Sequence, residues 1–200
     1  MVTPSASVRC AAPFVPRDPL VARSVLGLAG LPTILATGTF WDRSEAEQLA
    51  EAFATVRRRC VVQLAIFGTG KHRTTVLRTA YALGVGCDVH MIRNCSEGWW
   101  PDIVAAADVV APSHEPGPIS LLDILSAGRP VVAPIDPATV RLVVPASAGL
   151  VYRRGDISGM AASLLRLMTN PGLRYRMACR ALEVGRRDPL LMRLESSGDS

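Results

Sequence analysis

Short apolar runs alternate with longer amphipathic segments from Pro32 onward. The runs have the length of strands and are rich in β-branched residues, and they span 33–38, 61–68, 87–92, 108–113 and 130–134. The segments between them have the length and periodicity of helices, and they span 44–57, 71–83, 99–107 and 119–127. Ser44 is followed three residues later by Glu47, a capping-box pattern that predicts the start of the first helix.

Strands that are apolar on both faces and separated by helices are typical of a parallel sheet covered on both sides. The pattern therefore predicts a single Rossmann-like, doubly wound α/β domain. Residues 149–152 supply a sixth strand, which gives a mostly parallel six-stranded sheet, and two further helices divide at Asn170-Pro171. We place the domain at 32–187, with a proline-rich arm or linker at 1–31 and a polar tail at 188–200.

The composition is that of a globular protein. The 200 residues are 49% hydrophobic and 20% charged, and no run of about 18 apolar residues exists that could cross a membrane. The first residues lack an early basic cluster and contain Pro13 and Pro16, so we predict a cytoplasmic protein. Five cysteines without a CxxC pair or His/Cys spacing indicate neither a disulfide framework nor a zinc site.

The formal net charge of +5 comes from 22 Lys and Arg, of which Lys71 is the only lysine. Nine of the arginines follow Tyr152, and they predict either a peripheral contact with an anionic membrane at its inner face or an ordinary solvated helix surface. Aromatic residues do not interleave with these arginines in a stacking pattern, so we expect no nucleic-acid partner.

Two acids flank a segment rich in proline and glycine after the run 108–113. Ligands of doubly wound sheets bind outside the carboxyl ends of the strands, which is where this segment lies. Pro118 is a favoured first helical residue, so we expect a helix from there that carries Ser120 and Asp123, with Glu115 in the loop before it. The carboxylates suit sugar or ribose hydroxyls, and the N–H groups of Gly117, Ile119 and Ser120 suit a diphosphate.

A purely structural role for Glu115 and Asp123 explains the same pattern, because acids in a first helical turn often cap and solvate the helix. The Gly-Thr-Gly at 68–70 leads from strand to helix, but two glycines do not make a dinucleotide fingerprint. Both interpretations of the acids therefore stay open on the residues alone.

The segment EPGPISLLDILSAGRPVVA, residues 115–133, resembles the E-x7-E motif of retaining glycosyltransferases of the GT-B type (group 1, family 4-like), usually close to EPFGLVLLEAMACGKPVVA. PTILATGTF is similar to the first strand of that family's C-terminal domain, LAIFGTG to its second strand and turn, and AGLVYRRGD to its closing strand. The likeness runs from about Leu20 to Leu182 in the same order.

The resemblance implies a domain that binds a nucleoside-diphosphate sugar as donor substrate and needs no metal or other cofactor. In this family pattern Glu115 is the catalytic residue, because it contacts the donor sugar, while Asp123 holds the ribose and Arg93 borders the base. The remaining donor-binding residues implied are Gly38, Arg43, Gly68, Lys71, Gly117, Ile119 and Ser120.

The chain departs from the family pattern where positive charge is usual. Thr39 and Ser44 stand where the family has an arginine and a lysine, and Arg43, Lys71 or Arg73 are the candidates to replace them. Pro118 replaces a glycine and removes an N–H donor, and Arg141 replaces a common acid. Asp123 replaces the second glutamate, so its carboxylate lies one methylene closer to the helix.

The residues before Pro32 are similar to the linker that follows the acceptor-binding domain in this family. We therefore expect half of an enzyme, which is a truncated remnant, a subunit completed by a separate N-terminal acceptor-domain chain, or a domain of changed use. A catalytically inactive pseudo-glycosyltransferase, used as an interaction or accessory module, is the alternative that the departures favour. An unrelated Rossmann-like nucleotide enzyme is a third.

Overall fold

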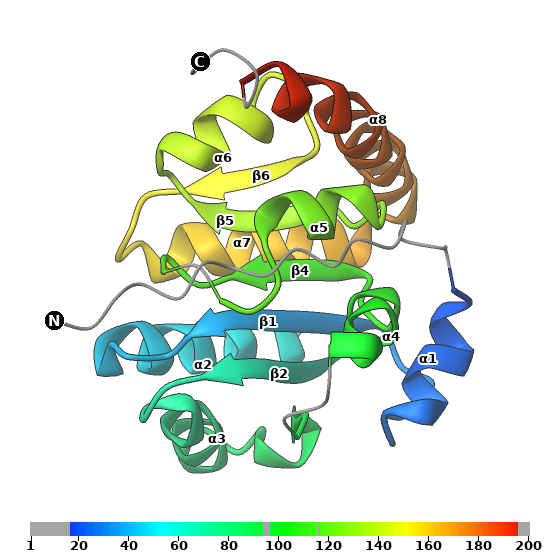
Figure 1. The fold of residues 1–200 in the computed structure, drawn as a ribbon. Coiled ribbons are helices and arrows are strands. Elements are labelled where there is room, and N and C mark those ends of the chain that lie inside the picture. Colours follow the sequence, from blue (N-terminus) through cyan, green and yellow to red (C-terminus); the bar gives the residue numbers. More distant parts are fainter. Residues whose placement is uncertain (1–16, 94–96, 116, 196–200) are drawn as a thin grey trace, which may run out of the picture.

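Six parallel strands form one sheet in the order β3-β2-β1-β4-β5-β6 (Figure 1). The computed structural model describes residues 17–93, 97–115 and 117–195, with the side chains of 97 and 187–195 excepted. Pro116 and the outermost parts of the predicted arm and tail therefore lie outside the described residues. The strands are β1 Thr33–Thr39, β2 Gln63–Thr69, β3 Val89–Met91, β4 Val109–Pro112, β5 Val131–Pro134 and β6 Gly149–Tyr152.

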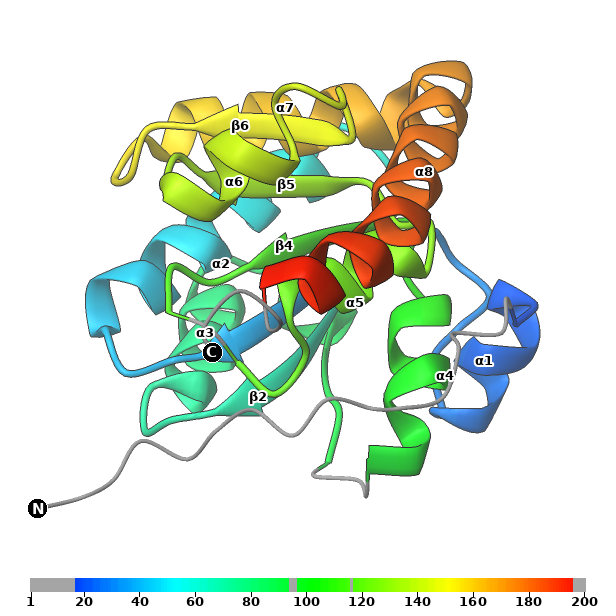
Figure 2. The same ribbon diagram turned by 45° about the horizontal axis from the view of Figure 1, so that its top comes forward.

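Helices cover both faces of the sheet (Figures 1 and 2). On one face lie α2 Arg43–Arg57, α3 Arg73–Ala82 and α7 Ile157–Thr169. On the other lie α4 Trp100–Ala105, α5 Leu121–Ser126 and α6 Pro137–Leu142, with α1 Pro19–Val25 packed on α4 and α8 Pro171–Glu195 packed on α5. Two short 3-10 helices, Gly86–Asp88 and Glu97–Trp99, flank β3. The predicted α/β architecture and the division at Asn170-Pro171 are confirmed.

The core has two halves, separated by the sheet. Along β1, Ile34 and Ala36 point into the half under α2, α3 and α7, whereas Leu35 points into the half under α4, α5 and α6. All three side chains are at most 1% exposed. This burial on both faces is what a doubly covered parallel strand requires, and it explains why three successive positions of β1 are apolar.

The strand order reverses between β1 and β4. The chain builds outward from β1 through β2 to β3, then returns to pair β4 with β1 and builds outward on the other side to β6. The loops that follow β1 and β4 therefore meet at the carboxyl edge of the sheet, which is the left edge in Figure 1. Doubly wound sheets bind their ligands at such a switch point.

Two predicted helix starts are wrong. α2 begins at Arg43, because the Asp42 carboxylate caps it by accepting the Ser44 N–H at 2.8 Å; Ser44 itself lies in the first turn. The other helix begins at Leu121 rather than near Pro118, because Ser120 takes the N-cap position. At α2 two cap-forming residues, Asp42 and Ser44, stand close together, and Asp42 takes the cap. At α5 the Ser120–Asp123 capping box prevails over the preference of Pro118 for a first helical position.

Residues 17–31, assigned to the arm in the sequence analysis, include α1, which carries a buried arginine into the domain. The Arg23 guanidinium donates to the Ala106 carbonyl at 2.8 Å and to the Asp108 carboxylate at 2.7 Å. This contact fixes α1 against the amino edge of the sheet. Within the described part of the chain, no helix is both long and apolar enough to cross a membrane.

Candidate functional site

Two glycine backbones approach each other where the loops after β1 and β4 meet. A Cβ atom on Gly117 would overlap the Cα of Gly38, and one on Gly38 would overlap the Oγ of Ser113. The Ser113 hydroxyl joins the two loops, since it accepts the Thr39 N–H at 3.2 Å and donates to the Glu115 carbonyl at 2.7 Å. Only glycine permits this approach, so the sequence fixes the path of both loops here.

Glu115 lies at this junction with an exposed side chain. The Thr39 hydroxyl donates to Glu115 Oε2 at 3.2 Å, across 76 positions of sequence. Thr39 thus orients the carboxylate from β1, at the position where the family pattern carries an arginine. The carboxylate keeps access to solvent and can accept hydrogen bonds from a ligand.

Asp123 caps α5. Its Oδ2 accepts the Ser120 hydroxyl at 2.6 Å and the Ser120 N–H at 3.1 Å, while the Asp123 N–H donates to the Ser120 hydroxyl. The capping role, one of the two interpretations left open by the sequence, is therefore what the structure displays for Asp123. Ser120 directs its N–H to this carboxylate, and the ribose role of Asp123 stays a prediction.

The basic candidates lie around the same edge of the sheet. Arg43 is exposed and donates to Glu47 at 2.8 Å on its own helix, and Lys71 and Arg93 are exposed in the turns after β2 and β3. Gly68 lies in β2 against the carbonyl of Gly38, and the Arg73 guanidinium donates to the Gly68 carbonyl at 2.7 Å. Arg73 thereby brings positive charge to the end of β2.

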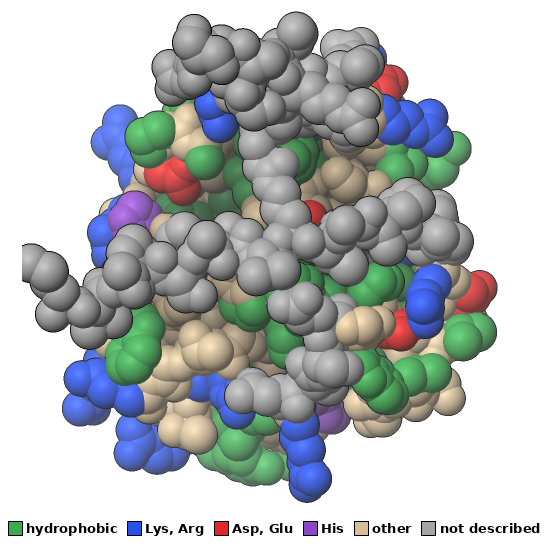
Figure 3. Space-filling view, viewed as in Figure 1, with side chains coloured by type: hydrophobic (Ala, Val, Ile, Leu, Met, Phe, Trp, Pro, Cys, Tyr) green, Lys and Arg blue, Asp and Glu red, His purple; other side chains and the backbone are tan. Residues whose placement is uncertain are grey.

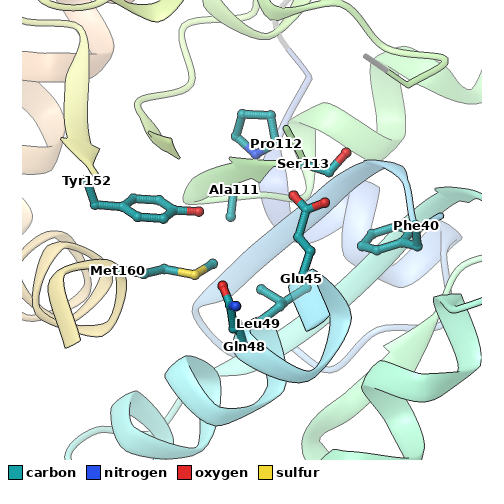
Figure 4. A pocket seen from close by; sticks show the side chains of 9 residues that line it. All are labelled: Phe40, Glu45, Gln48, Leu49, Ala111, Pro112, Ser113, Tyr152 and Met160. Carbon is teal, nitrogen blue, oxygen red and sulfur yellow. The ribbon is translucent and has the colours of Figure 1, made fainter. Parts of the chain in front are cut away.

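The first turn of α2 supplies a contact to the Glu115 loop that the sequence does not reveal. The Glu45 carboxylate accepts the His114 N–H at 2.7 Å, and Figure 4 shows it pointing toward Pro112 and Ser113, with the Tyr152 hydroxyl directed across the same small pocket. Burial raises the pKa of the Glu45 carboxyl, and the pKa of Tyr152 is raised by burial and by the Glu45 charge. An acid in a first helical turn is common, so no signal marked Glu45 in advance.

A cavity of about 490 Å³ opens beside Glu115. Its lining includes four of the predicted site residues, Glu115, Gly117, Ile119 and Ser120. Asp123, Arg43 and Lys71 are not among the described residues that line it. The motif residues from the loop before α5 therefore surround this cavity. Asp123, the second acid of the motif, lies in the first turn of α5 and outside the lining.

Among the residues that the structure describes, no group of three or more His, Cys, Asp or Glu side chains could hold a metal ion. The independence of the site from metals and other cofactors stays a prediction.

The glycosyl transferases group 1 family model matches residues 31–170, well over half of the chain. The chain belongs to this family. The matched range contains the glycine junction, Glu115 and Asp123, so the geometry described above lies within the family domain. Sugar transfer is accordingly the activity of the family to which this chain belongs.

One curated protein is similar in sequence to most of the chain. The chain is 29% identical to the alpha-D-kanosaminyltransferase of Streptomyces kanamyceticus over 161 residues, which are 78% of this chain and 41% of that protein. It thus spans about two-fifths of the length of this curated relative.

Two solved structures have closely similar folds. The C-terminal domain of the group 1 glycosyl transferase LpcC from Francisella tularensis has a TM-score of 0.74 at 17% identity, covering 86% of this chain and 93% of that one. Anabaena HepE in complex with UDP has a TM-score of 0.73 at 18% identity, covering 91% and 53%.

Proposed function

We propose that the chain is the donor-binding domain of a glycosyltransferase that takes a sugar from a nucleoside-diphosphate sugar. The observation that carries the proposal is the exposed Glu115 carboxylate, oriented by Thr39 beside the close approach of Gly38 and Gly117. This carboxylate can accept hydrogen bonds, and it lies beside glycine backbone at the point where the strand order reverses. Such an arrangement suits a ligand with hydroxyl groups. The similar fold of HepE, whose structure contains UDP, supports a nucleotide as part of this ligand.

In the proposed complex, Glu115 accepts hydrogen bonds from the donor sugar, and the N–H groups of Gly117 and Ile119 face the sugar or the diphosphate. Asp123 would reach the ribose with the part of its carboxylate that does not cap α5. Arg93, which follows β3, would border the base. Each assignment rests on the position of the residue in the fold together with its match to the family motif.

Positive charge near the diphosphate would stabilise the leaving group. Arg43 is already paired with Glu47, so the exposed Lys71 is the stronger candidate on this edge. In the transfer step, the bond between the anomeric carbon and the diphosphate oxygen breaks, and its electron pair leaves with the diphosphate. The acceptor oxygen forms the new bond to the anomeric carbon, and its proton passes to the departing diphosphate.

An acceptor-binding partner is part of the proposal. The chain spans 41% of its curated relative, and the proposed donor residues lie on one open edge of the sheet. A second domain or a separate chain facing this edge would exclude water and hold the acceptor. We therefore expect transfer only when such a partner is present, whereas donor binding should be a property of this domain.

Isothermal titration of the 200-residue chain with UDP, GDP and their common sugar conjugates tests the proposal. We expect micromolar to millimolar binding of one nucleotide, and a sugar conjugate that binds more weakly to Glu115→Gln by about tenfold. The matched control is Glu51→Gln, an exposed acid on α2. Absence of binding by every nucleotide at millimolar concentration would refute the proposal.

One observation favours a second function, that of an accessory module without catalysis. The Asp123 carboxylate is engaged by both the hydroxyl and the N–H of Ser120, and Arg43 by Glu47, so two proposed donor contacts have partners within the chain. A module of this kind would bind a protein partner equally well after Glu115→Gln and would not bind nucleotide. The same titrations therefore separate the two functions.

A further inference from the structure

The cavity beside Glu115 extends across the carboxyl ends of β1, β4 and β5. Gly117, which lies against Gly38 at the end of β1, lines one end of the cavity, and Pro137 and Ala138 of α6 line the other. Adjacent strands are about 4.8 Å apart, so β1 and β5, with β4 between them, are about 10 Å apart. A hexose with its substituents spans such a distance, so a donor sugar held at Glu115 also reaches α6.

Most polar side chains of this cavity already have hydrogen-bond partners within the chain. The hydroxyls of Ser113, Ser120 and Thr139 donate to protein acceptors at 2.7, 2.6 and 3.0 Å. The Asp136 carboxylate accepts the Thr139 N–H at 2.9 Å, and these two residues form the capping box of α6. The polar groups at the α6 end of the cavity therefore serve the helix cap.

The rest of the wall toward α5 and α6 is apolar. It consists of Leu121, Ala133, Pro134, Pro137 and Ala138. In Figure 3 hydrophobic and acidic side chains lie together over α6 on this face. A ligand hydroxyl placed against this wall would lose its water without gaining a partner, whereas a methyl group would gain from burial.

Two polar groups without a partner lie at the opposite side of the cavity, near Glu115. The Thr37 hydroxyl on β1 and Nδ1 of His114, in the loop after β4, are buried and have no hydrogen-bond partner among the described residues. Native proteins satisfy nearly all such groups. The ring hydroxyls of a sugar bound by Glu115 would supply partners here, so the cavity is polar on the Glu115 side and apolar on the α6 side.

The charge of the cavity restricts the sugar further. Glu115 and Asp136 contribute carboxylates, and the described lining residues include no Lys or Arg. In the proposed complex the donor diphosphate faces the N–H groups of Gly117 and Ile119, which offset its charge. The carboxylate of a uronic acid at the α6 end would instead face Asp136 and be repelled.

We propose that the donor sugar is a 6-deoxyhexose. The proposal rests on the proposed function, in which Glu115 accepts hydrogen bonds from the hydroxyls of the donor sugar. A carboxylate binds neighbouring ring hydroxyls, so the exocyclic carbon of the hexose projects away from Glu115 and toward Ala138. A methyl group at that carbon packs against the apolar wall, whereas the CH₂OH group of an ordinary hexose buries a hydroxyl there.

Isothermal titration of the full chain with two donors that differ only at this carbon tests the proposal. The pair is UDP-6-deoxyglucose with UDP-glucose if the chain binds UDP, and GDP-D-rhamnose with GDP-D-mannose if it binds GDP. We expect the 6-deoxy donor to bind about tenfold more tightly than its hydroxylated counterpart. The corresponding uronate should bind at least about tenfold more weakly than the hydroxylated donor.

Three variants locate the preference within the cavity. Ala138→Asn places an amide on the apolar wall as a partner for the 6-hydroxyl, so the ratio of the two affinities should fall below about threefold. Val140→Asn, on an exposed position of α6 outside the described lining, is the matched control and should keep the ratio. Thr37→Val removes a hydroxyl and keeps the shape, so it should weaken both donors by about fivefold and leave their ratio unchanged.

Equal affinities for the two donors, or a preference that survives Ala138→Asn, would overturn the proposal. A ratio that changes in Thr37→Val would also overturn it, because the exocyclic carbon would then lie at Thr37.

Titration with bare UDP and GDP separates this proposal from the proposed function. Binding of a bare nucleotide, together with equal affinities for the two donors, would refute the deoxy sugar alone. Absence of binding by both nucleotides at millimolar concentration would refute the donor function and the deoxy sugar with it.

Discussion

The Glu45 carboxylate accepts the backbone N–H of His114 at 2.7 Å, across 69 positions of sequence. This contact joins the first turn of α2 to the loop that carries Glu115. The end of β1 also holds this loop, since Thr39 donates its hydroxyl to the Glu115 carboxylate and its N–H to the Ser113 hydroxyl. β1 and α2 therefore position the loop that follows β4. They lie on the other side of the point where the strand order reverses.

Glu45→Ala should loosen this loop. The lost hydrogen bond is worth about 1 kcal/mol, so the His114 amide should exchange with solvent about fivefold faster. Glu47→Ala, in the same helix, removes an exposed ion pair and should leave the exchange rate unchanged. Hydrogen exchange followed by NMR measures both variants, and equal rates in the two would contradict the positioning role of Glu45.

Glu45 should also make the stability depend on pH. Burial raises the pKa of its carboxyl in the folded state, and the His114 N–H opposes part of that rise. A folded-state pKa above the unfolded one gives stability that is complete below the unfolded pKa and is lost as pH rises through the folded pKa.

Glu45→Gln cannot ionise, so its stability relative to the unmodified chain should increase as the pH rises from about 4 to about 7. Urea unfolding at several pH values measures this difference. If the unfolding free energies of the two proteins change with pH in parallel, the pKa of Glu45 is not raised by folding and the prediction is wrong.

Gly117→Ala should disrupt the glycine junction. The added Cβ overlaps the Cα of Gly38, and both partners are backbone that cannot rotate away. We expect a loss of about 2 kcal/mol in unfolding free energy and weaker nucleotide binding, because the Glu115 loop must shift. Gly98→Ala is the control, since a Cβ there meets nothing within 4 Å. Equal stability of the two variants would mean that the loops do not approach as described.

Asp108→Ala should destabilise the domain far from the proposed site. The Asp108 carboxylate accepts from Arg23 at 2.7 Å and from the Thr33 N–H at 2.7 Å, and the Arg23 side chain is 7% exposed. Its removal leaves a buried guanidinium without its carboxylate partner, at a cost of about 3 kcal/mol. The control Glu183→Ala removes an exposed ion pair and should change the unfolding free energy by less than about 0.5 kcal/mol. Chemical denaturation of both variants measures the contrast.

The strands and their parallel pairing could be predicted because burial on both faces forces an apolar residue at nearly every strand position. The sequence pattern predicts neither α1 nor α6, because each begins at a proline within a proline-rich segment that is typical of a loop. The start of α5 was misplaced because the preference of proline for a first helical residue competed with the Ser120 and Asp123 capping box, and the capping box prevailed.

The candidate site likewise contains some residues that the sequence indicates and others that only the structure shows. Glu115, Gly117 and Asp123 follow one another in a segment whose composition marks it, so the sequence alone indicates them. Glu45 and Thr39 are distant in sequence from Glu115, and their contacts with its loop depend on which side chains meet after folding. The capping of α5 by Asp123 was one of two open interpretations, and only the geometry shows the hydrogen bonds to Ser120.

The central claim is that a nucleotide binds at the carboxyl edge of β1 and β4. Amide NMR of the full chain titrated with UDP and with GDP tests it most directly. We predict that one nucleotide shifts the amide signals of Thr39, Gly117 and Ile119 together, at a common midpoint, and leaves Arg23 and Asp108 at the opposite edge unchanged. Shifts confined to other parts of the sheet, or no shifts with either nucleotide at millimolar concentration, would contradict the account.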